Sequence, residues 1–218
     1  MQKGLFITFE GTEGCGKSTQ VELLAQRLRA IGHRVRTLRE PGGTAIGEEI
    51  RHTLKHSKNN HAMTAETELL LMNASRAQLV REIIRPALAG GEIILCDRFY
   101  DSTTAYQGYG RQLDLQMVKA VIDVAVGDTR PDLTLLLTVS QEISESRRAV
   151  RQSTLPFIRD RMEEADRKFF ERVIRGYAAI AAAESNRFRA LDGSASVEIV
   201  CEKIWEVVQP VLPKVGRW

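Results

Sequence analysis

Eight residues near the start of the chain have the types and the spacing that bind phosphate groups. Residues 11–18 read GTEGCGKS, which is the pattern G-x-x-x-x-G-K-S. Glycines let the backbone turn so that successive N–H groups point at phosphate oxygens, and a helix that follows adds partial positive charge. In this pattern Lys17 reaches the β- and γ-phosphates and the Ser18 hydroxyl binds Mg²⁺. The pattern favours a nucleotide site over an accidental glycine-rich turn.

A second site residue follows an apolar run in the middle of the chain. Ile93, Ile94 and Leu95 lead through Cys96 into Asp97 and Arg98. Beside a phosphate-binding loop, Asp97 would hold Mg²⁺ directly or through water, although strands often end in aspartate without such a role. Arg98 would then point toward the phosphates, or else form a structural ion pair with Asp97.

Further arginines suggest that the acceptor is also anionic. A phosphate monoester has a second pKa near 6, so at neutral pH it is mostly a dianion and needs no catalytic base. What it needs is relief from charge repulsion as it approaches the nucleotide, and guanidinium groups supply this. Arg39 begins the segment REPGGT, and a cluster around Pro156 contains Arg147, Arg148, Arg151, Arg159 and Arg161. A solvated helix face remains the alternative for this cluster.

The elements that must position these residues alternate along the chain. Strands are expected at Leu5–Glu10, Arg34–Leu38, Glu92–Asp97, Leu133–Val139 and Phe188–Leu191, and helices at Lys17–Ile31, Ala45–Lys55, Thr64–Ala89, Leu115–Val126, Gln141–Val150, Glu163–Glu184 and Val197–Val207. This alternation predicts an α/β protein with the P-loop NTPase fold, a five-stranded parallel sheet with helices on both faces. Ligands bind such sheets at the carboxyl ends of the strands.

The composition fits a single domain of 218 residues, 1–218. The segment at about 147–161 is either a short lid or a plain loop between helices. A net charge of +3, from 31 basic and 28 acidic residues, argues against nucleic-acid and membrane partners. Cys15, Cys96 and Cys201 fit neither a disulfide framework nor a zinc site, so a cytoplasmic location is expected.

Six motifs together resemble the bacterial thymidylate kinases. They are FEGTEGCGKST, REPGGT, the R-A-Q of 76–78, DRFYDSTTAYQGYGR from 97 to 111, RPDLT and the DRME of 160–163, which extend over most of the chain. The second and fourth are far more specific than the phosphate-binding loop. The resemblance implies a kinase that makes deoxythymidine diphosphate (dTDP) from deoxythymidine monophosphate (dTMP) and MgATP. ATP would be bound by Gly11, Thr12, Glu13, Gly14, Cys15, Gly16, Lys17, Ser18 and Thr19.

The resemblance also implies roles for the other site residues. Arg39 and Arg98 would hold the acceptor phosphate, with Asp97 near the Mg²⁺. Glu13 would approach the sugar 3′-hydroxyl, and Tyr106 would leave no room for a ribose 2′-hydroxyl. Since the loop at 11–18 contains no arginine, the catalytic arginine is expected in the lid. The candidates are Arg151, Arg159 and Arg161.

For the thymine base, the resemblance implies hydrogen bonds from Arg76, helped by Thr103 and Gln107. Met72 stands where family members usually place a phenylalanine that stacks on thymine, so other acceptors stay open. The alternatives are another nucleoside monophosphate or nucleoside kinase, and a nucleotide-binding switch without phosphoryl transfer. The family is homodimeric, and the helix at 64–89 is the expected interface.

Overall fold

Five parallel strands form one sheet at the centre of the molecule. The computed structural model describes residues 4–154 and 166–214, with the backbone alone at 151–154. The strands are β1 (Leu5–Glu10), β2 (Val35–Arg39), β3 (Ile93–Asp97), β4 (Leu133–Thr138) and β5 (Phe188–Asp192), in the spatial order β2-β3-β1-β4-β5. Every neighbouring pair is parallel. The expected parallel α/β fold is therefore confirmed.

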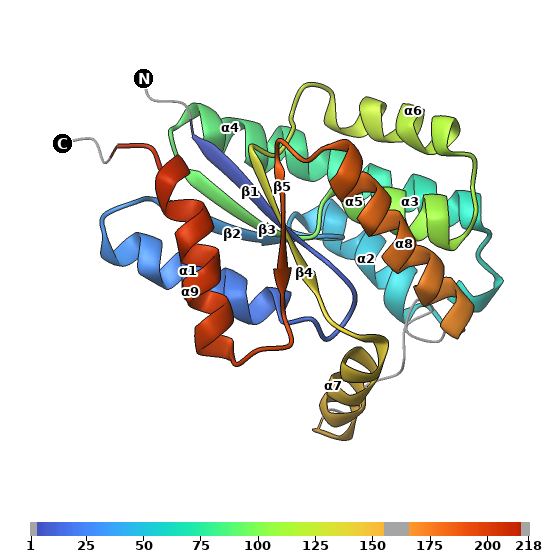
Figure 1. Ribbon diagram of the computed structural model, residues 1–218. Helices are drawn as coiled ribbons and strands as arrows, with labels where there is room; N and C mark the ends of the chain where they lie inside the picture. Colours follow the sequence, from blue (N-terminus) through green and yellow to red (C-terminus); the bar gives the residue numbers. More distant parts are fainter. Residues whose placement is uncertain (1–3, 155–165, 215–218) are drawn as a thin grey trace.

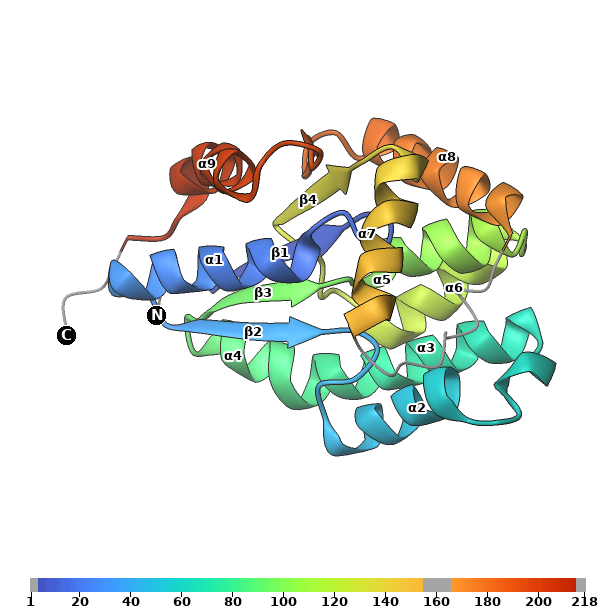
Figure 2. The same ribbon diagram turned by 90° about the horizontal axis from the view of Figure 1, so that it is seen from below.

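Helices cover both faces of the sheet (Figures 1 and 2). Helices α1 (Lys17–Ala30) and α9 (Val197–Val208) lie on one face. The other face carries α3 (Ala65–Leu79), α4 (Arg85–Ala89), α6 (Leu115–Val126) and α8 (Arg167–Ala183). Helix α2 (Ala45–His56) packs on α3, and α7 (Gln141–Thr154) projects beyond the carboxyl end of β4. Among the described residues, every helix is too short or too polar to cross a bilayer.

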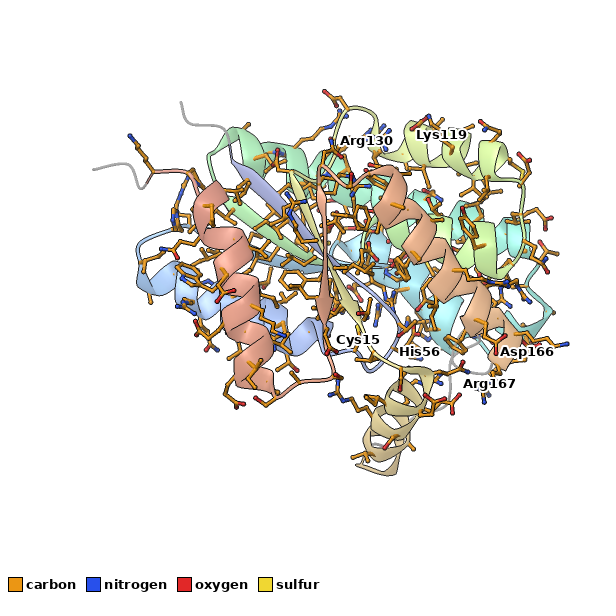
Figure 3. All side chains as sticks on the ribbon, in the orientation of Figure 1. Cys15, His56, Lys119, Arg130, Asp166 and Arg167 are labelled. Carbon is orange, nitrogen blue, oxygen red and sulfur yellow. The ribbon has the colours of Figure 1, made fainter. Side chains whose placement is uncertain are left out.

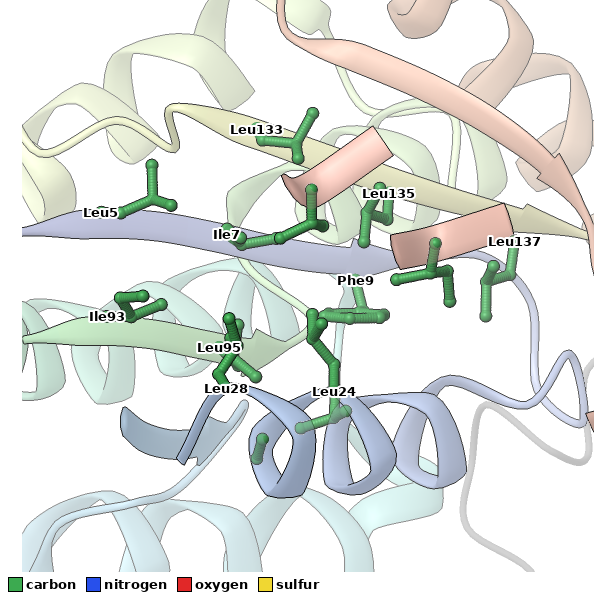
Figure 4. Close-up of a cluster of buried hydrophobic side chains, with 14 of the residues drawn as sticks. Leu5, Ile7, Phe9, Leu24, Leu28, Ile93, Leu95, Leu133, Leu135 and Leu137 are labelled. Atoms are coloured by element: carbon green, nitrogen blue, oxygen red, sulfur yellow. The ribbon is translucent and has the colours of Figure 1, made fainter. Parts of the chain in front are cut away.

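The two cores follow from the alternation of side chains along the strands. Leu5, Ile7 and Phe9 of β1 point to the face that α1 and α9 cover, where they meet leucines of α1, β3 and β4 (Figure 4). Phe6, between them, points to the opposite face and packs against Phe99 with ring centroids 5.0 Å apart. Because both faces of the central strands are buried, their sequences are almost continuously apolar.

Most of the longer helices begin at a side chain that caps them. Thr44, Thr64, Asp114, Asp166 and Ser196 each accept a hydrogen bond from the backbone N–H three residues later. Helix α1 differs, because it begins after Gly16, whose φ is 101° and which offers no side-chain cap. Its first N–H groups are therefore available to a ligand.

The structure changes four expected elements. Strand β2 is shifted by one residue, so Arg39 ends the strand instead of following it. The expected helix 64–89 contains a five-residue π-helical segment, Val80–Ile84, between α3 and α4. Helix α7 continues to Thr154, so the backbone of Arg151 is helical and does not belong to a loop. Helix α8 begins at Arg167, and 163–165 lie outside the described residues.

One helical region was not expected at all. Helix α5 (Tyr100–Thr103) runs directly into a π-helical segment, Thr104–Gly110. The short 3₁₀ turns Asn60–Ala62 and Gln209–Val211 were also not expected. Residues 100–110 are buried almost throughout, so they lack the apolar and polar periodicity that identifies a surface helix.

Candidate active site

The loop between β1 and α1 has the backbone of a phosphate-binding loop. Gly11, Gly14 and Gly16 have φ values of 132°, 75° and 101°, which side chains rarely adopt. A Cβ at Gly11 would lie 2.2 Å from the carbonyl oxygen of Leu137, so only glycine fits there. Lys17 Nζ donates to the carbonyl oxygens of Gly11 (3.0 Å) and Thr12 (2.9 Å). The lysine therefore lies over the loop whose N–H groups would bind phosphate.

Cys15 packs inside this loop. It is buried, and Lys17 Nζ lies 3.5 Å from its Sγ. The carbonyl oxygen of Cys15 is close to Gly193, which follows β5. Figure 3 shows Cys15 near the carboxyl ends of β4 and β5. The small thiol fills the loop.

A hydroxyl and a carboxylate meet at the mouth of the loop. Ser18, in the first turn of α1, donates from Oγ to Asp97 Oδ2 at 2.5 Å. Asp97 ends β3, the neighbour of β1 in the sheet, so the strand order brings the two residues together. Both are hard oxygen ligands of the kind that Mg²⁺ prefers. The described residues contain no group of three or more histidine, cysteine, aspartate or glutamate side chains placed to hold a metal ion.

Arg98 is held by the loop and not by Asp97. Its φ is 72°, and its Nη2 donates to Glu13 Oε1 at 2.8 Å. Tyr106 OH donates to the other oxygen of Glu13, also at 2.8 Å. Burial alone would raise the pKa of Glu13, but Arg98 and then Lys17 outweigh it, so the pKa of Glu13 lies below its ordinary value. The ion pair that the structure gives Arg98 is thus with Glu13 and not with Asp97, and a contact with the phosphates stays a prediction.

A buried carboxylate lies behind Arg98. Glu10 Oε2 accepts hydrogen bonds from Ser102 Oγ (2.6 Å) and Tyr177 OH (2.9 Å), and its Oε1 accepts one from the N–H of Phe99 (2.8 Å). Burial, with a further contribution from nearby Asp101, raises the pKa of Glu10 to about 7. Ser102 Oγ and Tyr177 OH are also 3.0 and 3.3 Å from Arg98 Nη1. This network orients the guanidinium.

Arg39 stands at the other side of the same space. It is about half exposed and pairs with Glu48 at 3.2 Å. Its position at the carboxyl end of β2, next to Asp97 at the end of β3, follows from the register of the two strands. Arg39 therefore has its guanidinium at the edge of the cavity with a partner that a phosphate can replace.

Arg76 is already bonded on every nitrogen. Nε donates to Glu40 Oε2 (2.8 Å), Nη1 to Asn73 Oδ1 (2.8 Å) and Thr103 Oγ1 (3.0 Å), and Nη2 to the carbonyl of Phe99 (3.3 Å). Its side chain is only 2% exposed. Any contact of Arg76 with a base must be shared with these partners or replace one of them.

The last predicted residues fall into three groups. Gln107 and Met72 both line the cavity, and Gln107 Nε2 donates to the buried Glu68 at 2.8 Å. Arg147, for which a solvated helix face was the alternative, instead donates to the carbonyls of Gly14 (3.3 Å) and Gly193 (3.0 Å). Arg148 stacks on Phe170, with Cζ 4.7 Å from the ring centroid. Arg159, Arg161 and the side chain of Arg151 lie outside the described residues.

These residues surround a cavity of about 610 Å³, which is within the usual size range of small-molecule sites. Its wall includes the predicted residues Glu13, Gly14, Cys15, Gly16, Lys17, Ser18, Thr19, Arg39, Met72, Arg76, Asp97, Arg98, Thr103, Tyr106 and Gln107. Gly11 and Thr12 lie behind the wall as acceptors for Lys17. Five further residues, not expected from the sequence, hold the predicted residues in place through carboxylates and hydroxyls: Glu10, Glu40, Glu68, Ser102 and Tyr177. The one available signal was the apolar context of Glu10, at the end of a buried strand directly before the loop.

Comparisons with known proteins point to one family. The sequence model of the thymidylate kinase family matches residues 9–204. The chain is 45% identical over 212 residues to a thymidylate kinase of Geobacter sulfurreducens, covering 97% of this chain and 99% of that protein. It is 47% identical over 206 residues to one of Alcanivorax borkumensis, covering 94% and 96%. The crystal structure of a thymidylate kinase from Ehrlichia chaffeensis has a TM-score of 0.75 at 32% identity, covering 95% of this chain and 99% of that one.

Proposed function

The chain belongs to the thymidylate kinase family. We therefore propose how the residues of its cavity bind ATP and dTMP and align them for phosphoryl transfer. The protein phosphorylates dTMP to dTDP. The observation that carries the proposed mechanism is that the phosphate-binding loop and Arg98 face one cavity and are joined there by Glu13. Neither a simple nucleotide switch nor a kinase of another substrate class is favoured by these relatives.

The ATP phosphates bind the loop. Backbone N–H groups of Gly14 to Thr19 and the uncapped start of α1 bind the β- and γ-phosphate oxygens. Lys17 exchanges its carbonyl partners, Gly11 and Thr12, for these oxygens. Arg151, Arg159 and Arg161 are proposed to neutralise the charge on the transferred group, and this stays a prediction from the family resemblance.

The dTMP phosphate binds between Arg39 and Arg98. As a dianion it attacks the γ-phosphorus directly, so the site needs charge neutralisation and alignment and no base. Arg98 is oriented by Glu13 and Tyr106, and Arg39 exchanges Glu48 for a phosphate oxygen. Because the two arginines come from the ends of β2 and β3, the sheet itself fixes the spacing between them.

The nucleoside lies deeper in the cavity. Met72, Arg76, Thr103 and Gln107 line the part proposed for thymine. Tyr106 is 2% exposed and lies against Glu13, so its ring limits the space around the sugar. These contacts support a preference for deoxyribose and for a pyrimidine of the thymine type.

The metal is proposed to be Mg²⁺, with Ser18 and Asp97 as its protein ligands. Bound there, Mg²⁺ would neutralise charge on the β- and γ-phosphate oxygens. The change Asp97→Asn should raise the Mg²⁺ concentration that gives half-maximal rate by about tenfold or more. A magnesium titration at saturating ATP and dTMP measures this, and an unchanged titration curve would remove Asp97 as a ligand.

Three further features complete the proposal. Residues 1–218 form one kinase domain, with a lid at about 147–161, of which 155–161 lie outside the described residues. Two copies associate through α3 and its continuation to Ala89. The three cysteines are free, which supports action in the cytoplasm.

The activity is tested by measuring ADP release with dTMP, dUMP, dCMP, dAMP and dGMP as acceptors. We expect dTMP to be used with the highest kcat/KM. Well-folded protein that releases no additional ADP when dTMP is added would contradict the proposed reaction, and equal use of several acceptors would point to a broader kinase.

A further inference from the structure

The amide of Gln107 has a fixed orientation. Its Nε2 is 2.8 Å from Glu68 Oε1, and both side chains are buried. A carboxylate oxygen only accepts hydrogen bonds, so the NH₂ group of Gln107 must face Glu68. No described residue is paired with Gln107 Oε1, and Gln107 lines the cavity. The amide oxygen is therefore the atom that Gln107 offers to a bound base.

Glu68 is itself held in place. It lies on α3, one turn before Met72, and is 1% exposed. Arg111 donates to it twice, from Nε to Oε1 at 3.2 Å and from Nη2 to Oε2 at 3.0 Å. The guanidinium of Arg111 also lies over the ring of Phe169, 4.8 Å from its centroid. A buried carboxylate with a double ion pair cannot easily turn away from Gln107.

We propose that Glu68 is a positioning residue that locks the Gln107 amide with its oxygen toward the base, and so selects bases that carry a hydrogen on N3. This inference rests on the proposed function, because it assumes that the base lies against Gln107. Thymine has a donor at N3 and cytosine has an acceptor there, so the locked oxygen matches the first and repels the second. Arg76, whose nitrogens are all bonded, contributes less to this choice.

The matched pair of acceptors for a test is dTMP and 5-methyl-dCMP. Both carry the 5-methyl group, the same sugar and the same phosphate, and they differ only along the N3 and C4 edge of the base. The quantity measured is the ratio of kcat/KM for dTMP to kcat/KM for 5-methyl-dCMP. A general loss of folding or catalysis changes both values and leaves the ratio unchanged.

The change Glu68→Gln puts an amide opposite an amide. The new side chain can present NH₂ to Gln107, which then turns its own oxygen toward residue 68 and its NH₂ toward the base. We expect the ratio to fall by about tenfold or more, because a site built to pair with a polar edge loses its discrimination when the partner is wrong. Glu92→Gln, which removes an exposed ion pair with Arg36 outside the cavity, is the control and should keep the parent ratio.

Further variants test whether Glu68 acts on the base through Gln107. Gln107→Leu removes the amide and should lower the ratio on its own; adding Glu68→Gln to it should then change the ratio no further, since Glu68 acts through Gln107. If Glu68→Gln does not fold, the double variant with Glu68→Met and Arg111→Met removes the lock without leaving a buried charge unpaired, and Met packs well beside an aromatic ring. It should show the same fall.

The outcomes separate the two hypotheses. A parent enzyme that does not use dTMP overturns the proposed function and this inference together. A parent that prefers dTMP, with a ratio that folded Glu68 variants leave unchanged, overturns the inference alone. A ratio that falls in Glu68→Gln equally with and without Gln107 also overturns it, because Glu68 would then act by another route.

Discussion

Arg98 shows how much of the site depends on the partners of a single side chain. It contacts Glu13 from the loop, Tyr106 from the π-helical segment and Tyr177 from α8. Burial by itself lowers the pKa of Arg98, but Tyr106, Glu13 and Tyr177 raise it well above its ordinary value. The guanidinium thus stays charged and fixed before a phosphate arrives, which is the preorganisation that makes electrostatic catalysis effective.

Arg39 offers the more direct test of acceptor binding. Its side chain is exposed and its pair with Glu48 contributes little to stability, so Arg39→Ala should fold normally. We expect the KM for dTMP to rise about tenfold while the KM for ATP is unchanged, since only the acceptor phosphate loses a charged partner. Initial rates over both substrates measure this.

The control for this variant is Arg36→Ala, on the same strand, whose side chain pairs with Glu92 away from the cavity. It should leave both KM values at the parent level. If Arg39→Ala raised the KM for ATP as much as that for dTMP, Arg39 would not be an acceptor ligand.

The raised pKa of Glu10 should make the stability of the fold depend on pH. Its pKa is raised from 4.5 to about 7, chiefly by burial, so between these values the folded state holds a proton that the unfolded state has lost. Stability should therefore fall as the pH rises from about 4.5 to about 7 and then level off, and Glu10 contributes up to about 3 kcal/mol of this fall. Glu10→Gln cannot ionise and should flatten the profile over that range.

Urea unfolding of both proteins at several pH values from 5 to 8 measures the effect. Parallel profiles for the parent and Glu10→Gln would mean that Glu10 titrates at its ordinary pKa in the folded protein.

At the scale of elements, α8 is tied to the phosphate site by Tyr177. The hydroxyl of Tyr177 lies 2.9 Å from both Glu10 Oε2 and Ser102 Oγ, and 3.3 Å from Arg98 Nη1. Tyr177→Phe keeps the ring in the core and removes only this link. We expect the KM for dTMP to rise several-fold, with the KM for ATP unchanged, because Arg98 loses one of its supports.

Steady-state kinetics, together with a thermal melt, separate this effect from simple destabilisation. Two outcomes would show that the Tyr177 hydroxyl stabilises the fold without orienting Arg98. In the first, both KM values change equally; in the second, neither KM changes and only the melting temperature falls.

The elements also show which features the sequence could predict. The five strands and the main helices were predicted correctly because their apolar runs and alternations are strong. Most of their boundaries differ from the prediction by one to a few residues. The helix at Tyr100–Gly110 was missed because burial on nearly all sides removes its periodicity. The end of α7 was placed too early because Arg151 to Thr154 are polar and precede a proline, although the helix continues to Thr154.

The same reasoning applies within the site. Glycine spacing identified the loop because its backbone conformations demand glycine. Glu68 and Tyr177 could not be identified, since their partners are 39 and 75 residues away in the chain. Glu10, whose partner Ser102 is 92 residues away, had only its apolar context as a signal. Only the folded sheet brings such pairs together.

At the scale of the whole molecule, α3 and α6 present apolar side chains to solvent. Leu70 of α3 is 58% exposed and Val124 of α6 is 77% exposed. We predict that Leu70→Glu yields a monomer, since it places a charge in the proposed dimer interface and touches little of the monomer core. Sedimentation velocity over a range of protein concentrations measures the state.

Ile199→Glu is the matched control, because Ile199 is 51% exposed on α9, on the opposite face of the sheet. It should leave the sedimentation coefficient unchanged. A parent protein that sediments as a monomer at every concentration would contradict the proposed dimer.

Glu13 connects helix α7 with Arg98 and Tyr106. Its carbonyl oxygen accepts a hydrogen bond from Ser144 of α7 at 2.7 Å, while its carboxylate holds Arg98 and Tyr106. If the nucleotide shifts the main chain at Glu13, the monophosphate side responds through the same residue. Linkage then requires the reverse as well: whatever factor ATP imposes on dTMP affinity, dTMP imposes on ATP affinity. Glu13 is thus one residue through which the binding of each substrate can change the affinity for the other.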